Sequence, residues 1–206
     1  MSSGNELQQK HADKIIMLIL AAGSSSRLGQ SKQLIKVNGV PLLRKTVLTA
    51  LETDSQHVTV VLGHNFEQHQ EVIQDLNIDV LHHVDWQNGM GSSIKAGVSH
   101  ILKTRGDTQA IVILVCDQPY LTAEHLNLLI TTHRTSKATI VASAYASTTG
   151  VPALFDKSMF AELLELKDDQ GAKKILEKHA GSIVEIKFPS GEIDIDTPSD
   201  YARLTR

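Results

Sequence analysis

An unbroken apolar run at residues 15–20 is the feature that most constrains the fold of this chain. A strand with one face in water alternates apolar and polar residues, so a continuous apolar run indicates a strand that is buried on both faces. A second run of this kind lies at 111–115. The two runs predict an α/β protein whose helices cover both sides of a central sheet.

Strand-like and helix-like segments alternate along the rest of the chain. Right-handed crossovers between such strands give a three-layer α/β/α architecture with a mostly parallel sheet. Ligands of such sheets bind beyond the carboxyl ends of the strands, so the loops after Leu20, Leu62, His82 and Val115 are expected to share one edge. The other strands are expected at 57–62, 78–82, 138–143, 151–155, 183–188 and 192–195, and helices at 41–51, 66–76, 92–102, 122–132, 157–166 and 171–179 and from Pro198.

Composition narrows the class of protein. The length of 206 residues predicts a single domain at 14–206, and the polar residues at 1–13 predict a flexible tail before it. The formal net charge of −3 gives no basic footprint for nucleic acid. The apolar runs fall far short of the roughly 20 residues that span a bilayer. The N-terminal residues are polar, unlike a signal peptide. With Cys116 as the one cysteine there is no intramolecular disulfide, and the expected location is the cytoplasm.

The loop after the first strand, residues 21–31, is rich in glycine and serine. Small side chains leave backbone amides uncovered, and glycines such as Gly23 and Gly29 permit the turns that form an anion-binding concavity. Arg27 adds a bidentate donor for phosphate and Lys32 a compact charge. The segment therefore suits a triphosphate, although a solvated surface loop with two cations is the alternative. It matches neither the dinucleotide-binding nor the P-loop pattern.

Leu20-Ala21-Ala22-Gly23-x-Ser25-x-Arg27-x-Gly29-x-x-Lys32 resembles the signature loop of the MobA-like nucleotidyltransferases. The double alanine is similar to the branch that contains molybdenum cofactor cytidylyltransferase and its relatives in purine catabolism. The resemblance implies a Rossmann-like nucleotidyltransferase fold. Further blocks in the family's order are Pro41-Leu42-Leu43, Gly89-Met90-Gly91-Ser92-Ser93, Cys116-Asp117-Gln118-Pro119, Gly150-Val151-Pro152 and Asp194-Ile195-Asp196-Thr197-Pro198.

Carboxylates at the same sheet edge are candidate metal ligands. Asp117 directly follows the apolar run 111–115, where an oxygen ligand beside a phosphate loop suits Mg²⁺. A turn aspartate is the alternative. Asp194 and Asp196 are two apart on an expected strand and so share a face. The resemblance implies that Asp196 supplies the second Mg²⁺ contact, with Asp194 as the fallback; a helix cap before Pro198 is the other interpretation of Asp196.

The glycine segment at 89–93 opens a predicted helix. Glycines allow close approach of a ligand and a helix N-terminus favours anions, whereas an ordinary serine-capped helix start is the alternative. The resemblance implies that Gly91 and Ser92 contact the base and sugar of the nucleotide. It also implies that Gly150-Val151-Pro152 and the 168–171 segment face the acceptor. Asp168-Asp169 stands where family members often carry Gly-Asp. His83 and Trp86 lie just before the glycine segment, where partly buried packing is expected and a place in the acceptor cleft is the alternative.

The resemblance implies Mg²⁺-dependent transfer of a cytidylyl group from CTP to the terminal phosphate of molybdenum-loaded molybdopterin, for use by a molybdenum hydroxylase. Arg27, Lys32 and Asp117 are the expected catalytic residues, and Asp117 and Asp196 the metal ligands. The expected nucleotide contacts are Leu20, Ala21, Ala22, Gly23, Ser24, Ser25, Arg27, Lys32, Gly91 and Ser92. A transferase acting on a sugar or polyol phosphate and a non-catalytic cofactor-delivery protein are the alternatives.

Overall fold

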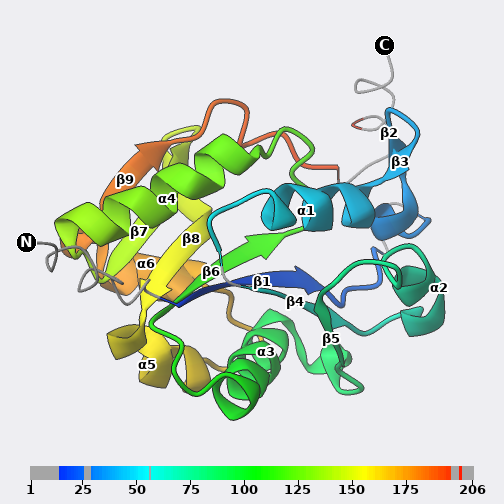
Figure 1. Cartoon of the computed structure of the whole chain (residues 1–206), viewed down its shortest axis with the longest axis horizontal. Coiled ribbons are helices and arrows are strands. Elements are labelled where there is room, and N and C mark those ends of the chain that lie inside the picture. The colour runs from blue at the N-terminus through cyan, green and yellow to red at the C-terminus, as the bar shows by residue number, and fades with distance from the viewer. Residues whose placement is uncertain (1–13, 26–28, 56, 196–199, 201–206) are drawn as a thin grey trace, which may run out of the picture.

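The central element of the structure is a seven-stranded sheet with the order β5-β4-β1-β6-β8-β7-β9. The computed structural model describes residues 14–25, 29–55, 57–195 and 200. Within this sheet β8 runs antiparallel to both of its neighbours and the other described pairs are parallel, which confirms a mostly parallel sheet (Figure 1). Its strands are β1 (Ile15–Ala21), β4 (His57–Leu62), β5 (Asp79–His82), β6 (Ala110–Val115), β7 (Ile140–Tyr145), β8 (Thr148–Asp156) and β9 (Val184–Lys187).

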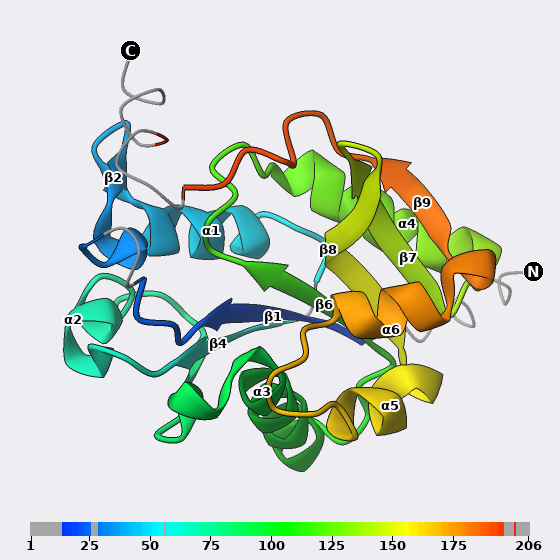
Figure 2. The same ribbon diagram turned by 180° about the vertical axis from the view of Figure 1, so that it is seen from behind.

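Helices cover both faces of the sheet, as the two-sided burial of β1 requires. Ile15, Met17 and Ile19 belong to the core on one side, whereas Ile16 and Leu18 belong to the core on the other. Figures 1 and 2 show the resulting three layers. One face is covered by α1 (Leu42–Leu51), α2 (Phe66–Glu71) and α4 (Ala123–Ser136), and the other by α3 (Met90–Thr104), α5 (Phe160–Leu164) and α6 (Lys173–Lys178). No helix in the described part of the chain is long and apolar enough to span a membrane.

The strand order reverses at β1. From β1 the chain builds β4 and β5 on one side and then crosses to β6 on the other side. Leu20 pairs with Val115 and Ala21 with Leu62, so the carboxyl ends of these strands lie together. A crevice beyond such a reversal is the usual ligand site of a parallel sheet.

Several helices differ in extent from the sequence expectation. The helix expected at 66–76 ends at Glu71, because the chain then tightens into turns in which the amide of Ile73 bonds to Gln70 O at 3.0 Å. The helix expected from Ser92 begins at Met90. The segment 157–166 divides into the 3-10 helix η4 (Lys157–Met159) and the short α5. Thr122 caps α4 as expected, with its side chain accepting from the amide of His125.

The strand expected at 192–195 is wrong. Residues 191–195 form a turn and an irregular segment outside the sheet, whose edge is β9. Ile195 is fully buried against Ile35, Val37 and Leu42 rather than paired in a ladder. Asp194 therefore lies on no strand, and the expectation that Asp194 and Asp196 share one strand face is wrong. Asp196 and Pro198 themselves lie outside the described residues, as does the expected tail at 1–13.

Two buried histidines predict a loss of stability in mild acid. Burial lowers the pKa of His69 and of His125 from 6.5 to about 4, and nearby His64 adds to the effect on His69. Above pH 6.5 these groups are neutral in the folded and unfolded chains, so they do not change the free energy of unfolding. As the pH falls from 6.5 towards 4, these histidines bind protons in the unfolded chain but stay neutral in the folded chain. Each histidine should then remove roughly 3 kcal/mol from the free energy of unfolding.

Urea unfolding over this pH range tests the assignment. In the variant His125→Gln, the difference between the numbers of protons bound by the unfolded and folded chains should fall by about one. The glutamine amide can still donate to Ser143 but does not titrate. His100→Gln changes a partly exposed histidine and serves as the matched control, with the pH slope of the original protein. An undiminished slope in His125→Gln would contradict the buried, neutral histidine.

Candidate active site

A pocket of about 350 Å³ opens beyond the carboxyl ends of β1 and β6. The loops after Leu20 and Val115 meet there, together with the segment that follows β5, which confirms the expected shared edge. The loop after Leu62 packs against Trp86, which lines the pocket, since a Cβ at Gly63 would stand 2.6 Å from the Trp86 side chain. The lining residues are Leu20, Ala21, Ala22, Gly23, Ser24, Lys32, Gln33, Trp86, Gln87, Gly89, Met90, Ser93, Val115, Cys116 and Asp117.

Most residues predicted for the phosphate-binding loop line this pocket. Leu20 to Ser24 do so, and so do Lys32 and Asp117. Ser25 lies at the edge of the neighbouring hollow with Ser31 and His64. Arg27 lies outside the described residues, so its role stays a prediction.

Between Ala21 and Ser24 the backbone carbonyls are bonded to the protein, whereas two amides are bonded to no described residue. The carbonyl of Ala22 accepts from the amide of His64 at 3.0 Å, and the carbonyls of Ala21 and Gly23 accept from the Gln33 side chain. Within the described residues the amides of Gly23 and Ser24 have no acceptor. The left-handed residues are Ser25 (φ 54°) and Gly29 (φ 70°), whereas Gly23 has no positive φ. With the carbonyls of Ala21, Ala22 and Gly23 bonded, this described part of the loop can offer the N–H groups of Gly23 and Ser24 to an anion.

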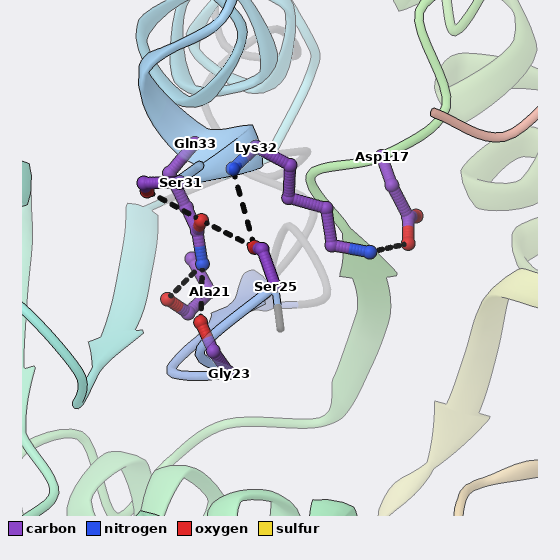
Figure 3. Close-up of polar contacts among 7 residues, drawn as sticks. All are labelled: Ala21, Gly23, Ser25, Ser31, Lys32, Gln33 and Asp117. Carbon is purple, nitrogen blue, oxygen red and sulfur yellow. Dashed lines mark hydrogen bonds and ion pairs between the residues drawn. The ribbon is translucent and has the colours of Figure 1, made fainter. Parts of the chain in front are cut away.

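Lys32 and Asp117 face each other across the pocket (Figure 3). Lys32 Nζ lies 2.7 Å from Asp117 Oδ2, and each side chain is 19% exposed. The second carboxylate oxygen, Asp117 Oδ1, is buried and has no hydrogen-bond partner among the described residues. An unpartnered buried carboxylate oxygen is costly, so a cation at this oxygen would be stabilising. Asp117 can therefore pair with Lys32 through Oδ2 while Oδ1 is available to bind a metal ion.

The C-terminal segment is attached to the loop that carries Asp117. The amide of Ile195 donates to Asp117 O at 3.1 Å. Gln118 Nε2 donates to Gly191 O at 3.0 Å and to Val151 O at 3.1 Å, which joins this loop to β8 as well. Asp194 is exposed, and its charge helps burial to raise the pKa of Tyr145, as does Asp117. The segment before Asp196 thus lies beside Asp117, whereas Asp196 itself lies outside the described residues.

The glycine segment is packed against the chain at 167–171. The amide of Gly91 donates to Asp168 O at 2.8 Å, and the Ser92 hydroxyl donates to Gly89 O at 2.8 Å while accepting from His83. Gly91 and Ser92 are buried, and the members of this segment that line the pocket are Gly89, Met90 and Ser93. A nucleotide contact from Gly91 or Ser92 stays a prediction. Asp168 here supports the start of α3, and its carboxylate also pairs with Lys95 at 2.6 Å.

Several lining residues were not among the predicted site residues, and Gln33 and Trp86 are two of them. Gln33 is 1% exposed, and no motif marks a glutamine as part of a phosphate loop. Trp86 lies in the 3-10 helix η3 (Trp86–Asn88) with its ring centroid 5.2 Å from that of His64. Its place just before the glycine segment was the available signal. Cys116 is buried, and burial raises the pKa of its thiol to about 12, so the expected role as a small apolar residue is confirmed.

Comparison with known proteins agrees with this geometry. The family model described as "MobA-like NTP transferase domain" matches residues 17–183. Purine catabolism protein PucB of Bacillus subtilis (strain 168) is 32% identical over 203 residues, which cover 93% of this chain and 96% of that protein. Molybdenum cofactor cytidylyltransferase of Escherichia coli (strain K12) is 24% identical over 184 residues, which cover 89% and 92%.

A solved structure extends the match to the fold. The crystal structure of Rv0371c from Mycobacterium tuberculosis H37Rv has a TM-score of 0.81 and 26% identity, covering 94% of this chain and 97% of that one. The structure of its complex with manganese has a TM-score of 0.77 and 24% identity, covering 93% and 97%. Because the family model spans most of the sequence, the chain belongs to the MobA-like NTP transferases and is a nucleotidyltransferase.

Proposed function

We propose that the protein transfers a cytidylyl group from CTP to the terminal phosphate of molybdenum-loaded molybdopterin. The observation that carries the proposal is the pocket in which Lys32 and Asp117 meet the amides of Gly23 and Ser24, which have no acceptor among the described residues. The choice of CTP and of the pterin acceptor is supported by Ala21-Ala22 and by the relative named molybdenum cofactor cytidylyltransferase. The product would then serve a molybdenum hydroxylase.

The residues supply positioning and charge neutralisation rather than a covalent intermediate. An oxygen of the acceptor phosphate attacks the α-phosphorus of CTP, the bond to the β-phosphate oxygen breaks, and pyrophosphate leaves with the electron pair. The amides of Gly23 and Ser24, with Arg27, would hold the β- and γ-phosphates. Lys32 would stabilise the negative charge that develops at the α-phosphate and the leaving group.

The residues present also fit a divalent cation. Asp117 Oδ1 is a buried hard oxygen without a partner in the described chain, which suits Mg²⁺. A relative of this fold was crystallised with manganese. Asp117 and Asp196 would hold the ion, which would neutralise phosphate charge when bound. Asp194 is the fallback for the second contact.

Pyrophosphate release tests this function. The purified protein with Mg²⁺ would be given each of the four common ribonucleoside triphosphates, with molybdenum-loaded molybdopterin or with sugar and polyol phosphates. We expect release with CTP and the pterin, and little with the other pairs. Faster release with a sugar or polyol phosphate would overturn the acceptor, faster release with another triphosphate would overturn the base, and tight pterin binding without release would favour a delivery protein.

A further inference from the structure

We propose that Gln33 is a positioning residue that shapes the nucleotide-binding loop and thereby sets the affinity for the triphosphate. The proposal rests on the proposed function, in which residues 21–25 hold the phosphates. Gln33 belongs to the 3-10 helix η2 (Lys32–Leu34), and its side chain reaches the inside of the loop (Figure 3). Gln33 is buried and is not one of the signature positions, so its polar amide needs a structural explanation.

All hydrogen-bonding groups of the Gln33 amide are used. Its Nε2 donates to Ala21 O at 3.1 Å and to Gly23 O at 2.8 Å. Its Oε1 accepts from Ser25 Oγ at 3.0 Å and from Ser31 Oγ at 2.8 Å. The two carbonyls can only accept, so the amide has one possible orientation. No other amino acid of this shape offers two donors and a double acceptor at this place.

The bonds to Gln33 fix the direction of the loop backbone. In a trans peptide the N–H points away from the preceding carbonyl, so binding the carbonyls of Ala21 and Gly23 turns the amides of Ala22 and Ser24 away from Gln33. Ser25 is left-handed, a conformation that a non-glycine residue adopts at a cost. Its hydroxyl is fixed by Gln33 Oε1 and by the amide of Lys32 at 3.2 Å. The Gln33 side chain therefore holds the loop in a conformation it would otherwise leave.

A second layer supports Gln33 from α2. Because Ser31 donates its hydroxyl proton to Gln33, it must accept from His69 Nε2, which lies 2.6 Å away. His69 is fully buried and its Nδ1 has no partner in the described chain, which fits a neutral ring with the proton on Nε2. The loop, the residues around Lys32 and α2 thus form one hydrogen-bond network with a single set of proton positions.

The test compares two changes of the same chemistry. Gln33→Met keeps the length of the side chain and removes its donors and acceptor. Gln74→Met makes the same change at an exposed glutamine outside the nucleotide-binding loop, as the matched control. Calorimetric titration with CTP and Mg²⁺ should give a dissociation constant about 10- to 100-fold higher for Gln33→Met, and an unchanged one for Gln74→Met. The KM for CTP should rise by a similar factor, while kcat at saturating CTP falls much less.

A merely structural role gives a different result. It would lower the thermal midpoint of Gln33→Met and leave the CTP affinity of the folded protein unchanged, which would overturn the proposal. Should Gln33→Met fail to fold, Ser31→Ala decides, because it removes one support of Gln33 at a partly exposed position. A several-fold weaker affinity is expected there, and an unchanged one would overturn the proposal. If the original protein bound no triphosphate, the proposed function itself would be wrong. If the original protein, Gln33→Met and Ser31→Ala all bound CTP equally well, only the proposed role of Gln33 would be wrong.

Discussion

Replacing Asp117 by asparagine is expected to reduce turnover by at least about 10²-fold while the fold is retained. The asparagine keeps the shape of the side chain and a carbonyl oxygen for Lys32, but it removes the charge that would hold a divalent cation. Steady-state pyrophosphate release at several Mg²⁺ and Mn²⁺ concentrations measures the loss. A higher metal requirement should accompany it.

The matched control is Asp85→Asn, which removes an exposed carboxylate from the segment between β5 and the pocket. It should retain the original rate, and both variants should retain the original circular dichroism. Near-normal turnover in Asp117→Asn at low metal concentration would show that this carboxylate is not the metal ligand.

Replacing Gly91 by alanine is expected to destabilise the protein by about 3 kcal/mol. A Cβ at this position would stand 2.0 Å from Lys167 O and 2.8 Å from Gln170 O, and backbone atoms cannot move aside as a flexible side chain can. The start of α3 or the 167–171 segment must shift, which weakens the bond from the Gly91 amide to Asp168. Thermal unfolding should show a midpoint lower by about 6–12 °C.

Gly181→Ala provides the comparison for that measurement. A Cβ at Gly181 would meet nothing within 4 Å and its φ is not positive, so the stability should stay the same or rise slightly. Equal midpoints for the two variants would mean that the 167–171 segment does not pack on the glycine segment in solution.

Patterns with a single physical cause predicted much of the fold. Residues 57–62 are β4 as expected, and β1 extends the predicted run by one residue. The unbroken apolar sequence of β1 has few alternatives to a strand buried on both faces. Asp117 and the loop after Leu20 also lie at the expected edge of the sheet. Their position follows from the topology of a parallel sheet rather than from contacts that the sequence would have to reveal.

Features that depend on tertiary contacts were not predictable in the same way. Residues 192–195 alternate in polarity like a strand, yet Ile195 is buried under α1 and bonded to the Asp117 loop, a site that no local pattern reveals. Gln33 is likewise defined by the carbonyls that surround it. The small hairpin of β2 (Lys36–Val37) and β3 (Val40–Pro41) is different, since Asn38-Gly39 between the two strands is a local turn signal.

Trp86 gives this pocket an optical probe of its own. It is the chain's one tryptophan, and it lies in the pocket lining against Gly63 and near the His64 ring. The ultraviolet emission of the unlabelled protein therefore comes chiefly from an indole at the candidate site. Ligand occupancy can be followed by that emission, in real time and without knowing the acceptor in advance.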